Sequence, residues 1–378
     1  MHTHLSFFGG MSLLFAAMLT SAHAQNTSML PPGVPPPGGN AGAPPTGVSV
    51  VLPPPAGFDV LTASPTAQAQ YAIPPMPDRQ LAPKAYEKWL KAVAGPQKQV
   101  PPFLTQTNIS NGPARRVGPS VPYADASETP SNSIVKTTSS NWSGTSVVNH
   151  NNPFNVEAII GEFVVPTAHQ AFGSCNGGWD FSSQWPGIDG FGSNDVLQAG
   201  VEVDAYCSGG TTASFYSAWI EWYPFNETRV SSPAIHPGDL IFIEVWNTSP
   251  TNGYAYFFNY STLESAEYNL TAPSGTTLVG NSIEWIVERP GVGGSLATLT
   301  NYIDVPWPYG IAWNYRASTP TYFYEGNNPP TPNTLYVITM LDNNGKNISS
   351  PTLENSDFLW FQDYGSACGV TGRSQPPC

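Results

Sequence analysis

The sequence predicts an all-β protein, a two-sheet β-sandwich of jelly-roll or concanavalin-like type preceded by a proline-rich and partly helical segment. From Ser139 onward, short runs rich in β-branched and aromatic residues alternate with turn residues. No stretch of that part has the 3.6-residue periodicity of a helix. The 378 residues include 35 Gly, 40 Pro and only 10% charged residues, as is typical of exported, turn-rich proteins.

Residues 1–24 have the pattern of a secretory signal peptide. An apolar run, Leu5–Leu19, is followed by Ala22-His23-Ala24, a small-residue cleavage site. The run is too short to span a bilayer, and no later stretch is suited to do so. We therefore expect a secreted, extracellular protein without a membrane partner, with the periplasm as the alternative location if the host is bacterial.

Residues 25–138 are predicted to be a propeptide. Residues 25–75 are rich in Pro, Gly and Ala, which predicts a linker or a disordered lead. Residues 96–138 are predicted to be extended, and Arg115-Arg116 is a basic pair at which processing could occur.

Residues 83–95 predict a short amphipathic helix within this propeptide, with Pro83 in its first turn and Gly95 just past its end. The apolar stripe is formed by Tyr86, Trp89, Leu90 and Val93, and the other side carries Lys84, Lys88 and Lys91. The helix is either an ordinary amphipathic element or the part of the propeptide that docks on an acidic body.

The charge of the chain is divided unevenly. The formal net charge is −13, but most of the 13 Lys and Arg residues precede residue 137, whereas most of the 26 acidic residues follow it. A basic leader and an acidic body attract each other until the carboxylates are protonated. The acidic body argues against nucleic acid as a partner, because it has no basic patch for phosphates.

Residues 139–378 are predicted to form a single β domain. Its expected strands are Gly144–Val148, Ala158–Val165, Val196–Asp204, Ala213–Tyr223, Leu240–Asn247, Tyr254–Asn259, Glu267–Leu270, Ser282–Glu288, Ala297–Ile303, Thr321–Tyr324, Thr334–Leu341 and Phe358–Phe361.

Three of these strands, the ones that contain Gln198, Glu221 and Glu284, alternate between apolar and polar residues with period two, as a half-buried strand must. If they lie in one sheet, one face collects Gln198, Glu202, Glu221 and Glu284. Such a face is either solvent-exposed surface or the floor of a catalytic site.

The four cysteines, an even number in an exported chain, favour disulfides. Of three possible pairings we favour Cys175–Cys207 with Cys368–Cys378. No metal site is expected, because no Cys-x-x-Cys motif or suitable His spacing is present. No cofactor is expected either, because the chain has no glycine-rich phosphate loop.

The familiar hydrolase motifs Gly-x-Ser-x-Gly and His-Glu-x-x-His do not occur in the sequence. The histidines of the β domain do not lie in strands beside a Ser or a Cys, which disfavours a Ser/His/Asp hydrolase. Among the hydrolase mechanisms, catalysis by carboxylate side chains remains.

A set of ordered blocks resembles the glutamic peptidases, also called eqolisins, which are secreted endopeptidases that act in acid. The blocks are Asn141–Gly144 (NWSG), Gly161–Pro166 (GEFVVP), Trp185–Gly190 (WPGIDG), Leu197–Gly200 (LQAG), Ala218–Pro224 (AWIEWYP), Gly238–Asp239 and Ile283–Glu288 (IEWIVE). The resemblance implies a sandwich of two curved antiparallel sheets, a basic propeptide and a catalytic Gln/Glu pair.

The family's glutamine corresponds to Gln198 and its glutamate to Glu284. In this reading Glu284 is the general base that activates water, and the Gln198 amide stabilises the oxyanion. A carboxylate with a reference pKa of about 4.3 is half-ionised in acid, so an acidic optimum is expected. The alternative is that both are ordinary strand residues.

Neighbouring residues are expected to support this pair. Trp142, Trp185 and Asp189 lie in blocks that resemble the family's cleft wall, although the two indoles could be core residues and Asp189 a turn cap. Glu202 and Glu221 are expected to share protons near the pair.

The resemblance implies a secreted acid endopeptidase that cleaves proteins or peptides, is made as a zymogen activated at low pH, and is inhibited by its own propeptide. We expect a monomer. A second hypothesis is a secreted β-sandwich that binds or hydrolyses carbohydrate, because jelly rolls with aromatics and paired Glu also act on glycans. A third is a secreted binding domain without catalysis, which the retention of Gln198 and Glu284 disfavours.

Overall fold

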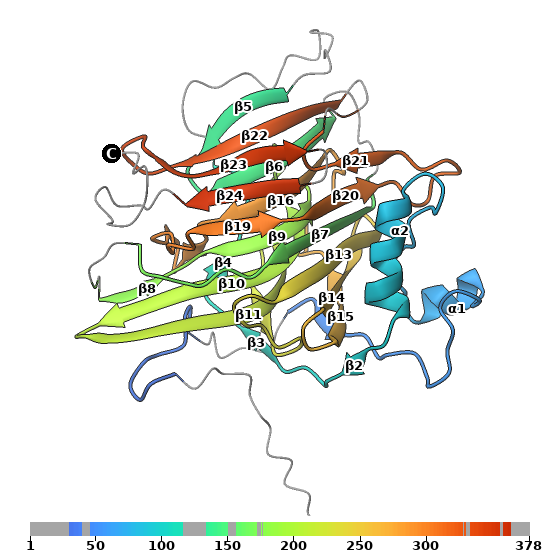
Figure 1. The fold of residues 1–378 in the computed structure, drawn as a ribbon, viewed down its shortest axis with the longest axis horizontal. Coiled ribbons are helices and arrows are strands. Elements are labelled where there is room, and N and C mark those ends of the chain that lie inside the picture. Colours follow the sequence, from blue (N-terminus) through green and yellow to red (C-terminus); the bar gives the residue numbers. More distant parts are fainter. Residues whose placement is uncertain are drawn as a thin grey trace, which may run out of the picture.

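The computed structural model describes residues 30–39, 46–115, 134–149, 156–171, 175, 177–327, 329, 333–355 and 358–363. The expected signal peptide (1–24), Cys368 and Cys378 lie outside these residues. The described chain forms two large stacked sheets with helices along one side (Figure 1). The predicted all-β sandwich is confirmed.

The smaller sheet has eight strands: β1 (Val48–Val50), β2 (Lys98–Gln99), β7 (Ala158–Val164), β13 (Leu240–Ser249), β14 (Asn252–Asn259), β15 (Glu264–Thr271), β20 (Tyr309–Trp313) and β21 (Tyr322–Tyr324). Their order is β1-β15-β14-β13-β7-β20-β21, and β2 also pairs with β15. The pairs are antiparallel except for β2 with β15.

The larger sheet has 13 strands: β3 (Leu104–Gln106), β5 (Ile134–Ser139), β6 (Trp142–Asn149), β8 (Gly178–Asp180), β9 (Ser183–Ile188), β10 (Val196–Ser208), β11 (Thr211–Tyr223), β12 (Thr228–Val230), β16 (Ser282–Glu288), β19 (Asp304–Trp307), β22 (Asn333–Leu341), β23 (Asn347–Asn355) and β24 (Phe358–Asp363). Their order is β19-β24-β23-β22-β6-β16-β9-β10-β11-β12-β3, with β5 on β22 and β8 on β10. A small third sheet joins β4 (Ile109–Ser110), β17 (Gly291–Val292) and β18 (Ser295–Leu296).

The main core lies between the two large sheets. Strand alternation sends Ile283, Trp285 and Val287 of β16 into it, where they meet residues such as Ile241 and Phe257 of the smaller sheet. The opposite faces of β10, β11 and β16 therefore point away from this core. That is the face on which the sequence predicts Gln198, Glu202, Glu221 and Glu284.

The helices are α1 (Pro65–Gln70), α2 (Pro83–Trp89) and the π-helical continuation η1 (Leu90–Ala94). Helix α2 covers the outer face of the smaller sheet (Figure 1), where Trp89 is fully buried beside apolar residues of β7, β13, β14 and β20. The predicted helix 83–95 is confirmed, but its buried face is rotated. Ala85 and Ala92 are buried with Trp89, whereas Tyr86 and Leu90 are only half-buried.

Two expectations about the chain are wrong. Residues 46–75 are not merely a linker, because β1 pairs with β15 and α1 begins at Pro65 with a Ser64 cap. Residues 297–303 form isolated bridges instead of a strand, and the regular strands follow as β19 and β20. The expected domain boundary at 138/139 falls inside β5, which pairs in parallel with β22.

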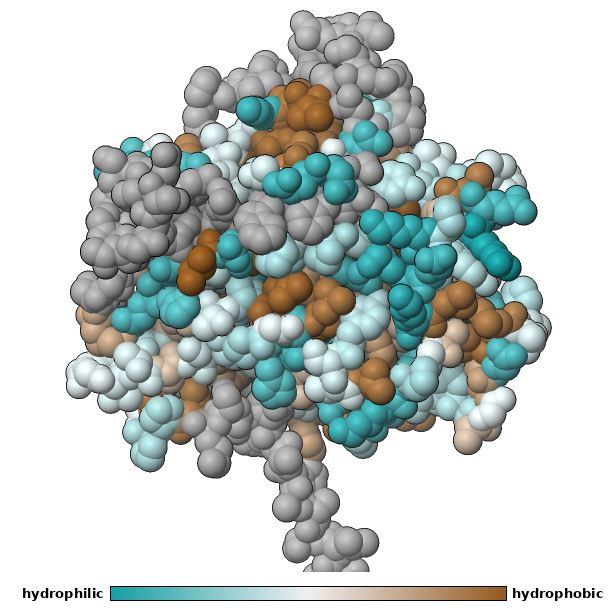
Figure 2. Space-filling model, viewed as in Figure 1, coloured by the Kyte–Doolittle hydropathy of each residue, from teal (hydrophilic) through white to brown (hydrophobic). Residues whose placement is uncertain are grey.

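The face seen in Figure 2 carries small apolar patches separated by polar and charged residues. None of the described helices is long and apolar enough to cross a membrane.

Candidate active site

Gln198 and Glu284 lie on strands separated by one other strand. Both are cross-strand partners of Gly187 on β9, Gln198 from β10 and Glu284 from β16. The row continues to Glu221 opposite Gln198 and to Ser146 opposite Glu284. Directly opposed residues of antiparallel strands point to the same face, so these side chains share one side of the larger sheet.

A second polar row runs parallel to the first, four residues further along each strand. Glu202 on β10 and Glu288 on β16 are both partners of Ser183 on β9. Between the two rows lie Trp185 and Trp219, which are fully buried. Two rows of carboxyl-bearing residues therefore lie on either side of a layer of aromatic side chains on this face of the sheet.

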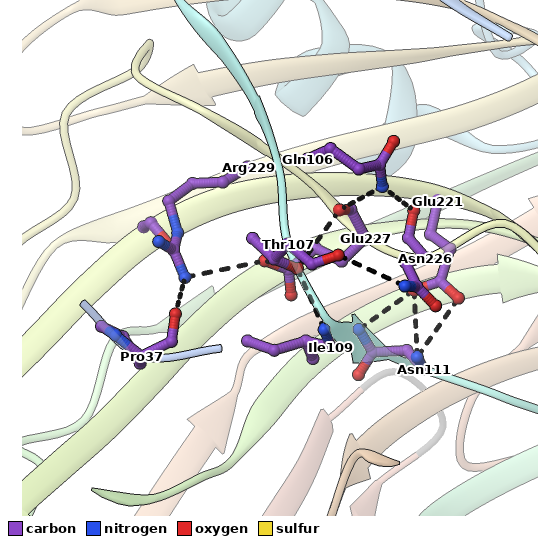
Figure 3. A network of polar contacts seen from close by, with 10 residues as sticks. Pro37, Gln106, Thr107, Ile109, Asn111, Glu221, Asn226, Glu227 and Arg229 are labelled. Carbon is purple, nitrogen blue, oxygen red and sulfur yellow. Dashed lines mark hydrogen bonds and ion pairs between the residues drawn. The ribbon is translucent and has the colours of Figure 1, made fainter. Parts of the chain in front are cut away.

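This face is not solvent surface in the described protein. Strand β3 adds to the edge strand β12, and the chain then crosses over the sheet through Thr107 and Asn111 (Figure 3). Its course across the face continues to residue 115. Gln198 and Glu284 are both 0% exposed as a result of this layer and the packing around it.

Asn111 lies directly on the predicted pair. The Gln198 side-chain amide donates a hydrogen bond from Nε2 to the Asn111 main-chain oxygen. The Asn111 backbone N–H donates to both Glu221 oxygens at 3.2 and 3.0 Å, and its side-chain amide donates to Glu221 Oε2 at 3.3 Å (Figure 3). The carbonyl of a peptide segment is thus held by the glutamine that the sequence predicts as an oxyanion donor.

Glu284 has one anchored oxygen and one free oxygen. The Ser146 hydroxyl donates to Oε1 at 3.1 Å, while Oε2 is buried without a hydrogen-bond partner among the described residues. Burial raises the pKa of Glu284 well above its ordinary value, and nearby hydroxyl groups offset this only in part. With the segment in place, Glu284 is therefore neutral in acid.

Trp142 and Trp185 pack edge-to-face with ring centroids 5.0 Å apart. The Trp142 indole donates to the Gly112 oxygen at 3.0 Å, so it contacts the covering segment directly. The Trp185 indole donates to Glu288 Oε2 at 3.0 Å, and Asn141 Nδ2 donates to Glu288 Oε1 at 3.1 Å. Both indoles are buried and belong to the polar face, not to the core between the sheets.

Asp189 lies at the end of β9 and holds the turn that leads into β16. Its carboxylate accepts hydrogen bonds from the backbone N–H groups of Val279, Gly280 and Asn281 at 2.7, 2.8 and 2.9 Å. Its own φ is +69°, an uncommon conformation for a residue other than glycine. Asp189 fixes the start of the strand that carries Glu284.

Glu202 belongs to a cluster of buried acids in the second row, four residues along β10 from Gln198 and separated from the first row by Trp185 and Trp219. Burial raises the pKa of Glu202 well above its ordinary value, and the neighbouring carboxyls of Asp204 and Glu227 raise it further. Burial likewise raises the pKa of Glu221 well above its ordinary value. Arg229 lies 3.9 Å from Glu227, and its charge lowers the pKa values of Asp204 and Glu227 in part (Figure 3). The cluster must therefore hold protons that its members share.

Five further residues of this site were not predicted from the sequence: Asn111, Asn141, Ser146, Glu227 and Glu288. Glu288 could have been found, since it lies four residues after Glu284 on an alternating strand. Asn111 has no local signal, because its contact with Gln198 spans 87 residues.

The predicted disulfide Cys175–Cys207 is confirmed. It joins the segment before β8 to the distal part of β10. No cluster of three or more His, Cys, Asp or Glu suited to a metal ion was found within the described ranges.

The arrangement of Gln198 and Glu284 is suited to the addition of water to a carbonyl group. An amide donor and a carboxyl face the same space above Gly187, which contributes no side chain of its own. A carboxylate can take a proton from water, and a preorganised amide can stabilise the negative charge that develops on a carbonyl oxygen.

Residues 140–319 match the family model described as the Peptidase A4 family. Over 182 residues the chain is 31% identical to aspergillopepsin-2 of Aspergillus niger, an alignment that covers 44% of this chain and 62% of that relative. The chain thus spans less than two thirds of this relative's length.

Among solved structures, scytalido-glutamic peptidase with a transition state analog inhibitor matches with a TM-score of 0.46 and 21% identity, over 60% of this chain and 100% of that one. Aspergilloglutamic peptidase from Aspergillus niger matches with a TM-score of 0.40 and 26% identity, over 49% and 99%. The resemblance to the glutamic peptidases is confirmed by the family match and the sequence identity.

Proposed function

We propose that this chain, whose β domain carries the Peptidase A4 match, is the precursor of a secreted acid endopeptidase in which Gln198 and Glu284 carry out the reaction. The observation that carries the proposal is the placement of both side chains opposite Gly187, with a main-chain carbonyl bound to Gln198. A segment of the chain itself lies on this face with its main chain hydrogen-bonded to Gln198 and Glu221, which favours a peptide substrate over a glycan.

In the proposed mechanism ionised Glu284 takes a proton from water, and the resulting hydroxide adds to the carbonyl carbon of the substrate. The Gln198 amide donates to the oxyanion, and since an amide does not titrate it remains a donor at every pH. Glu284 then returns the proton to the leaving nitrogen. Asp189 and Ser146 position Glu284, and Glu221 holds a backbone N–H of the bound chain.

We further propose that the propeptide keeps the precursor inactive. Its segment 104–115 fills the face that a substrate would need. Its helix α2 is tied to the smaller sheet by the buried Trp89 and by an ion pair between Lys88 and Glu162. Acid weakens the attraction between the basic leader and the acidic body as carboxylates become protonated. Low pH is thus the proposed trigger of release.

The experiment is to acidify the purified precursor to about pH 4, near the reference pKa of Glu, and to follow the hydrolysis of a denatured protein. The wild type should cleave it, and Gln198→Ala should lower the rate about 10²–10³-fold, as expected for loss of an oxyanion donor. Unchanged hydrolysis by Gln198→Ala would remove Gln198 from the mechanism, and no hydrolysis by the wild type would refute the proposed function.

A further inference from the structure

The segment across the active face is held on both sides of one peptide bond, the bond between Asn111 and Gly112. On the amino side, Glu221 accepts the Asn111 backbone N–H and its side-chain amide. On the carboxyl side, the Gly112 oxygen accepts from Trp142 Nε1 at 3.0 Å and from Asn141 Nδ2 at 3.4 Å. The carbonyl between these anchors accepts from Gln198 Nε2.

We propose that Asn111–Gly112 is the bond that the precursor cleaves in its own chain, and that the segment is therefore a bound substrate as well as a block. This inference rests on the proposed function and adds the site of processing. It follows from position: the Asn111 carbonyl oxygen lies at the one donor that the mechanism assigns to an oxyanion.

The step balances with water as its only co-reactant. Glu284 removes a proton from water, and the hydroxide forms a bond to the Asn111 carbonyl carbon, whose oxygen takes up the electron pair beside Gln198. The carbon–nitrogen bond then breaks, and the Gly112 nitrogen receives the proton from Glu284. The products are a carboxyl group on Asn111 and an amine on Gly112.

Room for water is present beside this bond. A cavity of about 280 Å³ borders Gly112, Asn141, Tyr223 and Glu288. Its lining combines polar side chains with glycines, Pro224 and Leu296, and Gln198 and Glu284 do not line it; the polar groups can hold water there by hydrogen bonds. The leaving-group side of the bond is thus adjacent to a space that water can enter.

The residue on the carboxyl side has to be small. A Cβ added to Gly112 would lie 3.1 Å from Tyr223 Cε2, so even an alanine there requires the tyrosine ring to shift by a few tenths of an ångström, and a larger side chain crowds it further. Asn111, by contrast, is fully buried and uses its amide to bind Glu221. The site therefore selects a hydrogen-bonding side chain before the cleaved bond and glycine after it.

The basic pair at 115–116 is the competing place for processing. Arg115 is exposed, and its backbone groups bond to Asn141 and to Ser140, not to Gln198 or Glu284. Arg116 lies outside the described residues. Cleavage there would require another peptidase or a large shift of the segment.

The test is to incubate the full precursor at a series of pH values from acid to neutral, because burial raises the pKa of Glu284 and the ionised base that cuts the covered bond is gained only as the pH rises. Samples are denatured before intact-mass measurement and amino-terminal sequencing, because the two products can remain bound to each other. The first new fragments should end at Asn111 and begin at Gly112. Their rate of formation should not depend on precursor concentration, since the bond already lies in the site.

Gly112→Val should slow this cleavage at least about tenfold, the effect of a barrier increase of about 1.4 kcal/mol. Gly178→Val is the matched control, because a Cβ at Gly178 meets no atom within 4 Å. Thermal unfolding of both variants shows whether the precursor still folds. If Gly112→Val is unfolded, Gly112→Ala, which adds only the Cβ, replaces it and should show slower cleavage than Gly178→Ala.

A denatured protein added to the same samples separates the two proposals. Cleavage of the added protein with a first self-cleavage at Arg115–Arg116, or with no self-cleavage, would overturn the Asn111–Gly112 site and leave the proposed function intact. If the wild type cleaves neither the added protein nor itself, the proposed function fails, and the processing site fails with it.

Discussion

Gln198 and Glu284 are on strands that do not pair with each other, yet each lies directly opposite Gly187 on the strand between them. Two strand spacings separate their backbones by about 9–10 Å. A side chain at position 187 would collide with the Trp185 ring and crowd Gln198. In the proposed mechanism the side chains of Gln198 and Glu284 act on one carbonyl group from opposite sides.

Gly187→Ala should therefore harm both stability and activity. A Cβ at this position would lie 2.7 Å from Trp185 Cζ3 and 3.2 Å from Gln198 Cβ. Overpacking of this kind lowers the free energy of unfolding by about 1–3 kcal/mol. Gly178→Ala is the control, since its Cβ meets nothing within 4 Å. Urea denaturation of both precursors checks this, and equal effects would contradict it.

The precursor should lose stability as the pH rises. Burial raises the folded-state pKa of Asp180 to about 6 and, with the nearby charge of Asp189, that of Asp195 to about 7. Glu202, Glu221 and Glu244 are shifted in the same direction, chiefly by burial. A raised folded pKa means that the folded state binds more protons than the unfolded state.

This stabilisation is fully present below about pH 4, the unfolded pKa of these acids. It is lost as the pH rises through the folded values, which include about 6 and about 7. The unfolding temperature should therefore fall between mildly acidic and neutral pH. Asp195→Asn should make the fall in unfolding temperature near pH 7 less steep, because Asp195 is the group with a folded pKa of about 7. An unfolding temperature that stays constant over this interval would count against the account.

A bound substrate should shift the pH dependence of catalysis. Burial beneath the covering segment raises the pKa of Glu284 well above its ordinary value. A substrate that covers the same face should do likewise, whereas in the free enzyme water reaches Glu284. The acid limb of kcat, which reports the complex, should therefore lie at higher pH than that of kcat/KM, which reports the free enzyme. Initial rates on a soluble peptide measure both limbs, and coincident limbs would be the contrary result.

The ion pair under helix α2 should matter more than the pair at the edge of the sheet. Lys88 reaches Glu162, which is 1% exposed and also accepts from Tyr260 at 2.6 Å. Lys88→Met should lower the free energy of unfolding at neutral pH by about 1–3 kcal/mol, the cost of leaving a buried acceptor without its hydrogen-bonding partner.

Lys98→Met is the matched control. Lys98 is 65% exposed, and it pairs with Glu264 at 3.0 Å. Surface pairs of this kind contribute about 0–1 kcal/mol. A larger effect for Lys98→Met than for Lys88→Met, measured by denaturation under the same conditions, would show that α2 is not held as described.

Strand alternation was sufficient to predict which residues share the polar face, because the period of two is fixed by the pleat. It assigned Gln198, Glu221 and Glu284 to one side, as the structure has them. It did not predict β9, the strand that brings them into one row, because Pro186 and Gly187 are unfavourable in strands.

The covering of that face could not be predicted either. The contact of Asn111 with Gln198 joins residues 87 positions apart, and no local pattern encodes it. The rotated face of α2 has a similar cause. Ala85 and Ala92 are small enough to lie against the sheet and are buried. The helical periodicity of the large apolar residues instead predicts that Tyr86 and Leu90 are buried, but both are only half-buried.

The central claim is that Glu284 is the base of a peptidase, and the direct measurement compares Glu284→Gln with Glu354→Gln. Glu354 is an exposed carboxyl on β23, so its replacement controls for the loss of one charge. After acidification of each precursor, Glu284→Gln should hydrolyse a denatured protein about 10²–10⁴-fold more slowly than the wild type, the usual contribution of a general base. Glu354→Gln should match the wild type. Retained proteolysis in the Glu284→Gln protein would contradict the account.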